Sequence, residues 1–569
     1  MFLGTFYKLI EFCLKINFKN FSKLLILVII KILLFFATVF LLKQMINLLV
    51  EKQVNIVFCY LFYYIITFLF SKCIVVYYDY IQQIFKLELE YKINSIFIDK
   101  CKNMSMIDFE NTETYNSIQK TLRDINVPYA MILNVLDVIT NISMLIGSII
   151  ILAKWKLYTV IYLVIVPICC VYLVFIIGKK EYEMSKIRII NVRKSNYYRF
   201  LLTDINSYKE NKIFRLGVFF TKNFIENIDK INIKDKLIFK YLFINGIIFQ
   251  ILETIMLFFT VYIVLKDIIN SFITIGTGYL YLNCILNVVN SSEKISKNIS
   301  NLLNKKLYLD ELFEFIYKKD PNINNKKYIK IKKIETIEFK NVWFKYRENL
   351  EYAIKNINLK INANDKIIII GENGSGKSTF IKLLCGFYDN YEGEILINGI
   401  SMKEIEKESL YNNLSVLFQD YMRYEFNVED NICISDLNEK DKIINFIKKL
   451  NQQNILKFLD YKGNIKLGHK FDDGYEISNG EWQQIAFSRA IFKRHSCLIL
   501  DEPTTSTDID IENNIFNIIN DIQNNIVILI THKLYLLNNS YKWIVFSNGK
   551  ILKKNEIKKM LKYKEYYGK

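Results

Sequence analysis

The segment from Gly371 to Thr379 has the residue types and the spacing of a loop that binds phosphate. It matches the pattern G-x-x-x-x-G-K-S/T and follows an apolar strand pattern, Lys366 to Ile370. Glycines let backbone N–H groups surround phosphate oxygens, and the helix pattern that follows adds the positive end of its dipole. We expect Lys377 to hold the β- and γ-phosphates of ATP and the Ser378 hydroxyl to bind Mg²⁺. The whole loop consists of Gly371, Glu372, Asn373, Gly374, Ser375, Gly376, Lys377, Ser378 and Thr379.

Two carboxylates follow a second apolar strand pattern further along the chain. The run from Cys497 to Leu500 is apolar, and Asp501 and Glu502 come directly after it. Taken alone, such a pair most often marks a turn. Together with the phosphate loop, it predicts that Asp501 holds Mg²⁺, directly or through water, and that Glu502 polarises the attacking water.

These motifs lie in a half of the chain whose composition differs from that of the half before it. The chain has 569 residues, of which 52% are hydrophobic and 15% aromatic, and long uncharged runs fill its first half. From about residue 335 onward, apolar strands alternate with helical patterns, as in a soluble α/β protein. We therefore expect a membrane part at residues 1–317, a polar linker at 318–334 and a nucleotide-binding part at 335–569.

Six segments of the first half are apolar enough to cross a bilayer, which takes about 20 residues of helix. They are Leu24–Leu42, Ile56–Tyr77, Tyr129–Leu152, Leu157–Ile177, Leu237–Leu265 and Ile273–Val289. The connections after the second and fourth segments are long and basic, and positive charge gathers on the cytoplasmic side. This predicts a multi-pass protein of the plasma membrane with a cytoplasmic nucleotide-binding part. The outer loop Lys154–Lys156 is a mild exception to the charge rule.

Charge, cysteines and the N-terminus narrow the class of protein further. A formal net charge of +18 would suit a nucleic-acid partner, but the basic residues concentrate in the cytoplasmic loops, so we expect membrane lipid and no nucleic acid as partners. The 10 cysteines have no CxxC pair and no metal-ligand spacing, which predicts reduced thiols. Residues 1–20 lack a cleavage site and are expected to form an interfacial entry helix.

Three ionisable residues inside the predicted spans are candidates for function, because a charge is costly in hydrocarbon. Asp137 and Glu253 either line a polar cavity that receives substrate or pair with neighbouring groups. Lys31 either shares such a role or extends its ammonium toward the interface. In the long loops, 108–115 and 202–210 are expected near the tips of helical hairpins, where they either dock into another domain or are solvated.

The order of motifs in the second half resembles the ATP-binding cassette of ABC transporters. In that family an aromatic residue stacks on adenine, a glutamine senses Mg²⁺ and contacts the membrane domain, a histidine reaches the γ-phosphate, and an aspartate lies in a loop that crosses the cassette dimer. The matching residues here are Tyr346, Gln419, His532 and Asp508. The six spans resemble the membrane domain of ABC exporters, and the two loop tips then match its coupling helices. The resemblance implies a helical membrane domain joined to an α/β P-loop NTPase cassette that uses ATP and Mg²⁺.

One motif departs from the family pattern. The usual signature is Leu-Ser-Gly-Gly-Gln, whereas this chain has Asn479 between Ser478 and Gly480, and Glu481 after them. Ser478 and Gly480 remain to face the γ-phosphate bound by a partner subunit. Asn adopts left-handed backbone angles more readily than other side chains, so we expect the turn to survive with a weaker contact. The run 468–483 resembles bacterial exporters of lantibiotics and related peptides.

The resemblance implies a half-transporter, because signature and phosphate loop lie on opposite faces of a cassette and this chain has one cassette. It would dimerise with itself or, given Asn479, with a homologous chain. The implied activity is ATP hydrolysis that drives export by alternating access, with a peptide as the first choice of substrate. The alternatives are export of a lipid, glycolipid or drug and, from another class, an ATP-gated channel or regulatory membrane protein that does not pump.

Overall fold

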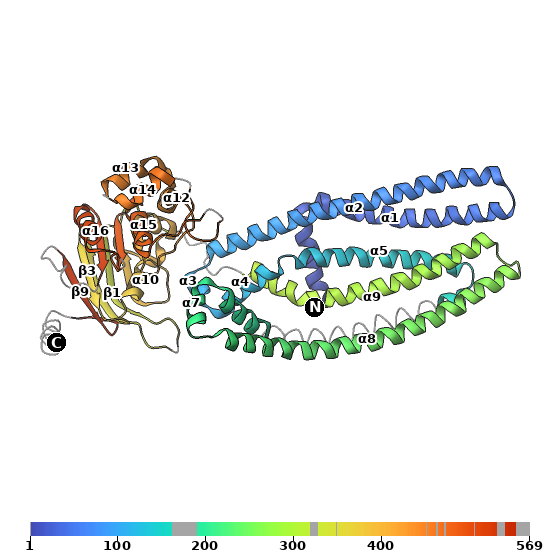
Figure 1. Cartoon of the computed structure of the whole chain (residues 1–569), viewed down its shortest axis with the longest axis horizontal. Coiled ribbons are helices and arrows are strands. Elements are labelled where there is room, and N and C mark those ends of the chain that lie inside the picture. The colour runs from blue at the N-terminus through green and yellow to red at the C-terminus, as the bar shows by residue number, and fades with distance from the viewer. Residues whose placement is uncertain are drawn as a thin grey trace. The chain divides into compact units, whose positions relative to one another are not determined.

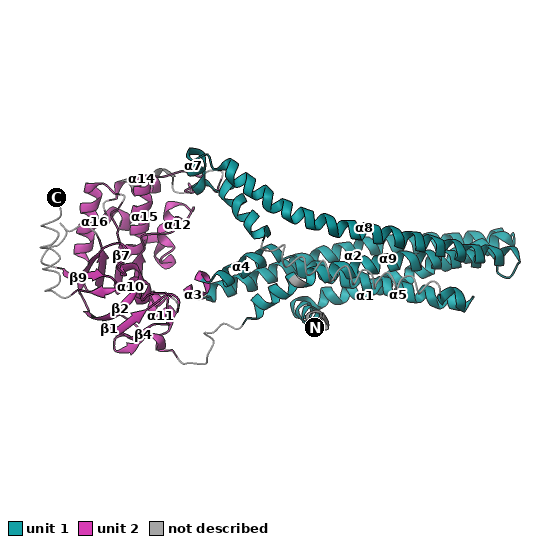
Figure 2. Ribbon diagram, turned by 90° about the horizontal axis from the view of Figure 1, so that it is seen from below, with its two compact units in different colours: residues 1–104, 111–320 teal, residues 105–110, 321–569 magenta. Residues whose placement is uncertain are grey.

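The computed structural model describes residues 2–161, 191–318, 328–348, 350–450, 452–462, 465–471, 474–505, 507–531 and 541–552. The chain forms two compact units (Figure 2). Met1–Met104 and Asn111–Asp320 make up the first unit, and Ser105–Glu110 and Pro321–Lys569 make up the second. A short segment of the chain's first half therefore belongs to the second unit.

The first unit is a bundle of long helices joined by short ones (Figure 1). The long helices are α1 (Phe2–Val50), α2 (Val54–Asn103), α5 (Val127–Ala153), α8 (Gly217–Ile269) and α9 (Ile275–Tyr317). The short ones are α4 (Thr112–Asp124) and α7 (Ile205–Ile213). Among the described residues, four helices, α1, α2, α5 and α8, are long and apolar enough to cross a membrane, and they contain the first, second, third and fifth predicted spans. The sixth predicted span lies in α9, whereas the fourth lies outside the described residues beyond residue 161.

Apolar residues at helical spacing hold α1, α2, α5 and α9 together. On α2, Phe85, Leu89 and Ile93 recur every fourth residue and are fully buried. They pack in one cluster with residues such as Met131 of α5 and Leu309 of α9. Spacing of three to four residues puts side chains on one face of a helix, so these faces form the interior of the bundle.

A break in α1 separates the predicted entry helix from the first span. Asn17 has non-helical angles, φ −152° and ψ 86°. Its side-chain amide donates to Glu88 of α2 at 2.7 Å, and Asn20 donates to the same carboxylate at 2.9 Å. These partly buried contacts with a charged acceptor offset the helical hydrogen bond lost at the break.

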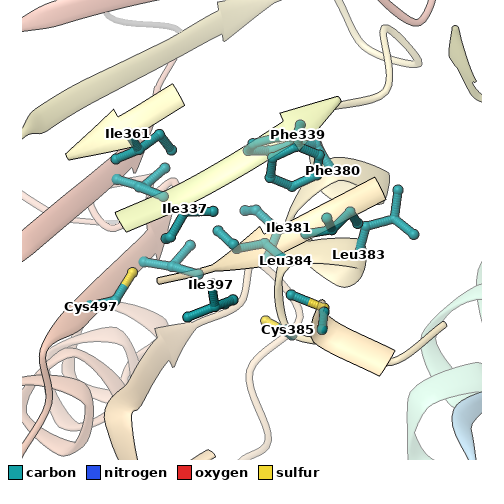
Figure 3. Close-up of a cluster of buried hydrophobic side chains, with 14 of the residues drawn as sticks. Ile337, Phe339, Ile361, Phe380, Ile381, Leu383, Leu384, Cys385, Ile397 and Cys497 are labelled. Carbon is teal, nitrogen blue, oxygen red and sulfur yellow. The ribbon is translucent and has the colours of Figure 1, made fainter. Parts of the chain in front are cut away.

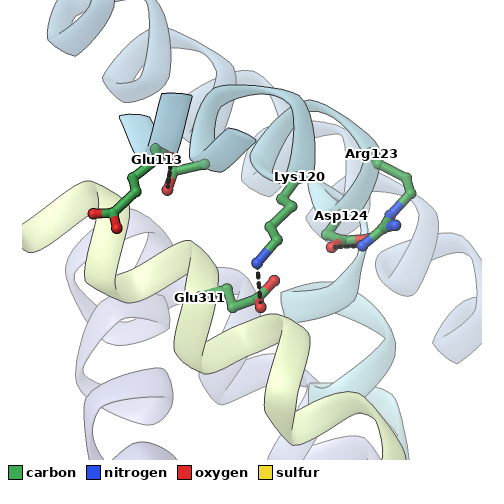
Figure 4. Close-up of polar contacts among 6 residues, drawn as sticks. Glu113, Lys120, Arg123, Asp124 and Glu311 are labelled. Carbon is green, nitrogen blue, oxygen red and sulfur yellow. Dashed lines mark hydrogen bonds and ion pairs between the residues drawn. The ribbon is translucent and has the colours of Figure 1, made fainter. Parts of the chain in front are cut away.

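An ion pair joins the short helix α4 to α9 (Figure 4). Lys120 forms an ion pair of 2.6 Å with Glu311, and both side chains are about three-quarters buried. Beside them Arg123 makes two hydrogen bonds of 2.8 Å to its neighbour Asp124. At the start of α4, the Asn111 side chain accepts from the Glu113 N–H and caps the helix.

The second unit contains two sheets. The first is antiparallel, in the order β2 (Ile354–Asn362), β1 (Thr336–Phe344), β4 (Glu392–Ile397) and β5 (Ile400–Ser401). The second has the order β10 (Lys550–Ile551), β9 (Lys542–Ser547), β3 (Lys366–Gly371), β8 (Ile526–Ile530), β7 (Cys497–Asp501) and β6 (Leu414–Leu417). Its strands are parallel except for the β9–β10 pair.

The helices of the second unit follow the strands in an α/β order. They are α10 (Lys377–Leu384), α11 (Lys407–Asn413), α12 (Val428–Cys433), α13 (Ile443–Lys449), α14 (Gln453–Lys462), α15 (Asn479–Phe492) and α16 (Ile509–Asp521). The core between the two sheets includes Phe339 of β1 and Phe380 of α10, whose rings lie 4.7 Å apart (Figure 3). β3 and β7, which carry the two predicted motifs, are separated by β8 alone, so both motifs end at one edge of the sheet.

The second unit also includes the short helix α3 (Met106–Glu110). Met106 packs against the core that contains Phe339 and Phe380. The carboxylate of Glu110 accepts a hydrogen bond of 2.7 Å from the Tyr388 hydroxyl and lies 3.5 Å from the Lys382 ammonium. Part of the predicted loop tip at 108–115 is thus built into the cassette, whereas α7, at the other predicted tip, belongs to the first unit.

Candidate nucleotide site

The phosphate loop joins the buried strand β3 to the first turn of α10. Gly374 and Gly376 have φ of +77° and +105°, angles that glycine adopts without strain. A Cβ on Gly376 would lie 2.8 Å from the carbonyl oxygen of Ala353, so the backbone there is also too close for a side chain. The loop can therefore turn its N–H groups toward one point in front of α10.

Lys377 begins α10 and points back over this loop. Its ammonium donates to the carbonyl oxygens of Gly371, at 2.7 Å, and Glu372, at 2.9 Å. Burial lowers its pKa, and the carboxylates of Glu502 and Asp501 oppose that shift. These carboxylates keep a positive charge favourable at the place where phosphate oxygens would bind.

Asp501 ends β7, and Glu502 follows it in an unusual backbone conformation. Burial raises the pKa of Asp501 to about 6, with Glu502 as the second cause. Glu502 has φ of +51°, which is rare for a residue with a side chain and is typical of functional sites. Its carboxylate accepts a hydrogen bond of 3.1 Å from the side-chain amide of Gln419.

Gln483 is a site residue that sequence reasoning did not single out. It lies on α15 and is 2% exposed. Its amide donates to the backbone carbonyl of Glu502 at 3.0 Å and to the Thr505 hydroxyl at 3.1 Å. Gln483 therefore holds the backbone that carries the candidate base. Its position in the helix that begins with the signature could have marked it in the sequence. Its hydrogen bond to Glu502 can be recognised only in the three-dimensional structure.

The loop, the two carboxylates and Gln419 surround one open pocket of about 450 Å³. It is lined by Tyr346, Ala353, Asn373, Gly374, Ser375, Gly376, Lys377, Ser378, Thr379, Gln419, Asp501 and Glu502. The buried hydroxyl oxygen of Ser375 has no hydrogen-bond partner among the described residues. A phosphate oxygen would satisfy this hydroxyl. A hydroxyl, an amide oxygen and two carboxylates are also the hard oxygen ligands that suit Mg²⁺.

Tyr346 stands at one wall of the pocket, as expected of a residue that stacks on adenine. Its hydroxyl lies 3.0 Å from that of Thr379 in α10. Its ring meets the ring of Tyr388 edge to face, with centroids 5.6 Å apart. The Tyr388 hydroxyl in turn donates a hydrogen bond to Glu110. Tyr388 therefore connects the wall of the pocket to α3.

The predicted signature residues lie away from this pocket. Ser478 caps α15, its hydroxyl accepts from the Glu481 N–H at 3.2 Å, and the Glu481 carboxylate accepts from Ser478 in return. Ser478 and Gly480 are not among the residues that line the pocket, in keeping with a role toward another cassette. Asn479 is the first residue of α15 and does not have a positive φ, so the turn does not require left-handed angles at this position.

The remaining predicted site residues are Asp508 and His532. Asp508 precedes α16 and does not line the pocket. His532 lies outside the described residues, directly after Thr531, which follows the buried strand β8. The structure thus brings together the phosphate loop, Tyr346, Gln419, Asp501 and Glu502, and the roles of all these residues stay predictions.

Comparison with known proteins agrees with this arrangement. The profile of the ABC transporter family matches residues 354–505. The chain is 31% identical to the subtilin transport ATP-binding protein of Bacillus subtilis, over 94% of this chain and 88% of that protein. It is 27% identical to the nisin transport ATP-binding protein of Lactococcus lactis subsp. lactis, over 93% of this chain and 90% of that protein.

A solved structure shares the whole fold. It is a bacterial Atm1-family ABC exporter with ATP bound, which superposes with a TM-score of 0.81 at 16% identity and covers 96% of this chain and 98% of its own. The predicted fold class is therefore confirmed, with a helical membrane domain of exporter type and a P-loop cassette. The chain belongs to the ABC transporter family, as a multi-pass half-transporter whose one cassette couples ATP hydrolysis to transport.

Proposed function

We propose that this half-transporter works as a dimer and exports a peptide. The observation that carries the choice of a peptide is similarity along nearly the whole chain, membrane domain included, to relatives named for the transport of subtilin and nisin. Residues that choose a substrate lie in the membrane domain, so similarity that extends through it bears on the substrate. We place the membrane domain at 1–317, the linker at 318–334 and the cassette at 335–569.

In the proposed mechanism the chain's own residues divide the work at one pocket. Backbone N–H groups of the phosphate loop and the Lys377 ammonium bind the β- and γ-phosphates of ATP. Tyr346 stacks on adenine. The Glu502 carboxylate, held by Gln419, orients the attacking water and takes its proton. His532 and Gln419 complete the catalytic group.

Mg²⁺ fits this pocket as a cofactor. Ser378, Gln419 and Asp501 would hold it, and it would neutralise charge on the phosphate oxygens during transfer. A bound cation also favours the ionised form of Asp501, whose pKa burial otherwise raises to about 6.

A complete ATP site requires a second cassette, because Ser478, Gly480 and Asp508 do not line the phosphate-loop pocket of their own cassette. We propose a two-fold homodimer in which each signature closes on the nucleotide of the other subunit. A heterodimer with a homologous chain is the alternative assembly, since Asn479 departs from the usual signature.

The test is ATP-dependent uptake of a fluorescent amphipathic peptide into inside-out vesicles that contain the purified protein. We expect uptake with Mg-ATP and loss of uptake in the Glu502→Gln variant. A fluorescent phospholipid provides the competing arm. Translocation of the lipid without peptide uptake would reject peptide export in favour of a lipid exporter, and ATPase activity with neither would favour a regulatory role.

A further inference from the structure

The buried face of α8 carries two carboxylates with different surroundings. Glu253, Met256, Thr260, Val264 and Asp267 recur at helical spacing and are each 8% exposed or less, so they form one inward stripe. A carboxylate on such a stripe loses water and requires a partner. Asp267 lies at the outer end of this stripe, and Glu253 lies deeper in the membrane.

Asp267 is balanced by groups of its own chain. Its carboxylate forms an ion pair of 2.6 Å with Lys156 and accepts a hydrogen bond of 2.9 Å from the indole N–H of Trp155. Trp155 also stacks on Tyr281 of α9 at 4.9 Å. This pairing gives a structural role to the outer lysine that was an exception to the charge rule.

Glu253 has no such balance among the described residues. It is 2% exposed, and its Oε2 atom is buried without a hydrogen-bond partner. The charged group that acts on it is another carboxylate, that of Glu293 on α9. The stretch 162–177, which contains most of the predicted fourth span, has no Lys, Arg or His in its sequence.

Asp137, the other carboxylate predicted inside a span, differs from Glu253. It is exposed on the isolated chain, and both Lys31 and Lys294 act on it electrostatically. Lys31 also interacts with Asp79 and lies over the ring of Tyr78 at 4.1 Å. Among the described residues, cations therefore act on Asp137, and none acts on Glu253.

All of these charged groups except Asp79 and the outer Asp267 lie at a similar depth in the membrane domain. At 1.5 Å of rise per residue, Glu253 lies about 21 Å along α8 from Asp267, in the inner half of a hydrocarbon layer about 30 Å thick. The same rise puts Lys31, Asp137 and Lys294 about 24 to 28 Å from the outer ends of their helices, and Asp79 deeper. Lys72 of α2 also lies about 27 Å from the outer end of its helix, so the carboxylates of Asp137, Glu253 and Glu293 are equal in number to the ammonium groups of Lys31, Lys72 and Lys294. What distinguishes Glu253 is that its Oε2 atom is buried without a hydrogen-bond partner among the described residues.

We propose that Glu253 is the seat for a cationic group of the exported molecule, a primary ammonium or a guanidinium. This inference rests on the proposed export function and specifies the charge of its substrate. A cation would neutralise the buried carboxylate and satisfy its Oε2 atom. Alternating access would present the seat to one side of the membrane at a time.

The experiment measures ATPase stimulation in proteoliposomes by two matched peptides. One is a short peptide of alternating Leu and Lys, and the other is the same peptide with every lysine acetylated, so that size is nearly kept and charge is removed. We expect the cationic peptide to stimulate at a concentration at least about tenfold lower, as for loss of one partner of a buried charge pair. The Glu253→Gln variant should abolish this preference, whereas Glu253→Asp and the matched control Asp137→Asn should retain it.

The outcomes separate the seat from peptide export. Equal stimulation by both peptides in the wild type, or a preference that survives Glu253→Gln, overturns the seat and leaves peptide export standing. Tetraphenylphosphonium, a lipophilic cation that is not a peptide, forms the second arm. Stimulation by this ion that depends on Glu253, with no response to either peptide, supports the seat and rejects the peptide as substrate. Monodisperse elution of each variant in detergent confirms that it is folded.

Discussion

At the scale of single residues, the carboxylate proposed as the catalytic base depends on contacts that hold it in an uncommon conformation. Glu502 has a positive φ, its side chain meets Gln419, and its backbone carbonyl meets Gln483. A strained backbone of this kind persists when several neighbours determine it together. The rate of hydrolysis is therefore expected to respond to Gln483 as well as to Glu502 itself.

Replacing Glu502 by Gln should keep ATP binding and reduce ATP turnover by about a hundredfold or more, because an amide cannot accept the proton of the attacking water. The measurement is ATPase activity together with binding of a fluorescent ATP analogue. Glu476, an exposed carboxylate 3.0 Å from His469, supplies the control. The Glu476→Gln variant should hydrolyse ATP normally, and an undiminished rate in Glu502→Gln would remove Glu502 as the base.

Replacing Gln483 by Glu should lower kcat about tenfold and leave KM for ATP nearly unchanged. The new carboxylate has the same shape but no N–H to donate to the Glu502 carbonyl, so the base is displaced while the phosphate loop is intact. Steady-state kinetics separates the two constants, and Gln453→Glu at the exposed start of α14 is the control. A rise in KM with an unchanged kcat would contradict a positioning role.

The affinity for the metal should fall in acid because of Asp501. Its folded pKa of about 6 lies above the ordinary value of 3.8 for Asp, so the metal-free site retains a proton until the pH rises through 6. Ionisation of Asp501 lowers the stability of the metal-free cassette. Binding of a cation requires the ionised carboxylate. At pH 5 about one tenth of the carboxyl is ionised, so we expect about tenfold weaker binding than at pH 7.5.

Binding of Mn²⁺ with a non-hydrolysable ATP analogue, followed by electron paramagnetic resonance, measures this change. The same measurement on the Asp501→Asn variant gives the pH dependence that comes from protonation of the ATP analogue itself, and this part is subtracted. A metal affinity that differs by the same factor in wild type and variant would show that Asp501 is not the titrating group.

At the scale of elements, the end of α9 depends on a lysine from another helix. Lys100 of α2 is 8% exposed, and its ammonium donates to the carbonyl oxygens of Ile316, at 3.1 Å, and Lys318. The last carbonyls of a helix have no partner within it, and a cation also suits the negative end of the dipole. Lys100 thus fixes the last turn of α9 directly before the linker.

Replacing Lys100 by Met should destabilise the membrane domain by about 1–3 kcal/mol, because buried carbonyls would lose their donor. The apparent Tm of the detergent-solubilised protein measures the effect. Lys102→Met, at an exposed position on the same helix, is the matched control and should leave Tm unchanged. Equal Tm values for the two variants would argue against the capping role.

Much of this fold was predictable where a periodic pattern or a spaced motif specified it. Long apolar runs predicted the spans in α1, α2, α5 and α8, and the phosphate loop predicted the turn between β3 and α10. Contacts between distant segments were not predictable, because side-chain direction depends on tertiary packing. Gln483 at the Glu502 carbonyl and Glu110 at the Tyr388 hydroxyl are two such contacts.

At the scale of the whole molecule, one cassette per chain makes the active form an assembly. The pocket collects the phosphate loop and the carboxylates but not the signature residues Ser478 and Gly480. Binding energy from two nucleotides would then stabilise the closed pair of cassettes, and hydrolysis would release it. The strength of this pair is expected to depend on ATP.

Two differently tagged copies of the chain, produced together, should co-purify in detergent and form a tighter pair with Mg-ATP in the Glu502→Gln background, because bound ATP is not consumed there. Sequential affinity purification and mass photometry measure the association. The Lys377→Ala variant should lose the response to ATP. Recovery of a different homologous chain in place of the second tagged copy would decide for the heterodimer.

Residues 105–110 form part of the cassette unit although the chain on both sides of them belongs to the helical unit. Met106 fills a place on the cassette core, and Glu110 is held by the Tyr388 hydroxyl. A small molecule that took the place of Met106 and competed for that hydroxyl would bind outside the nucleotide pocket, next to its Tyr346 wall. Such a compound would act as a non-competitive inhibitor whose selectivity came from a surface that soluble ATPases without this inserted helix do not have.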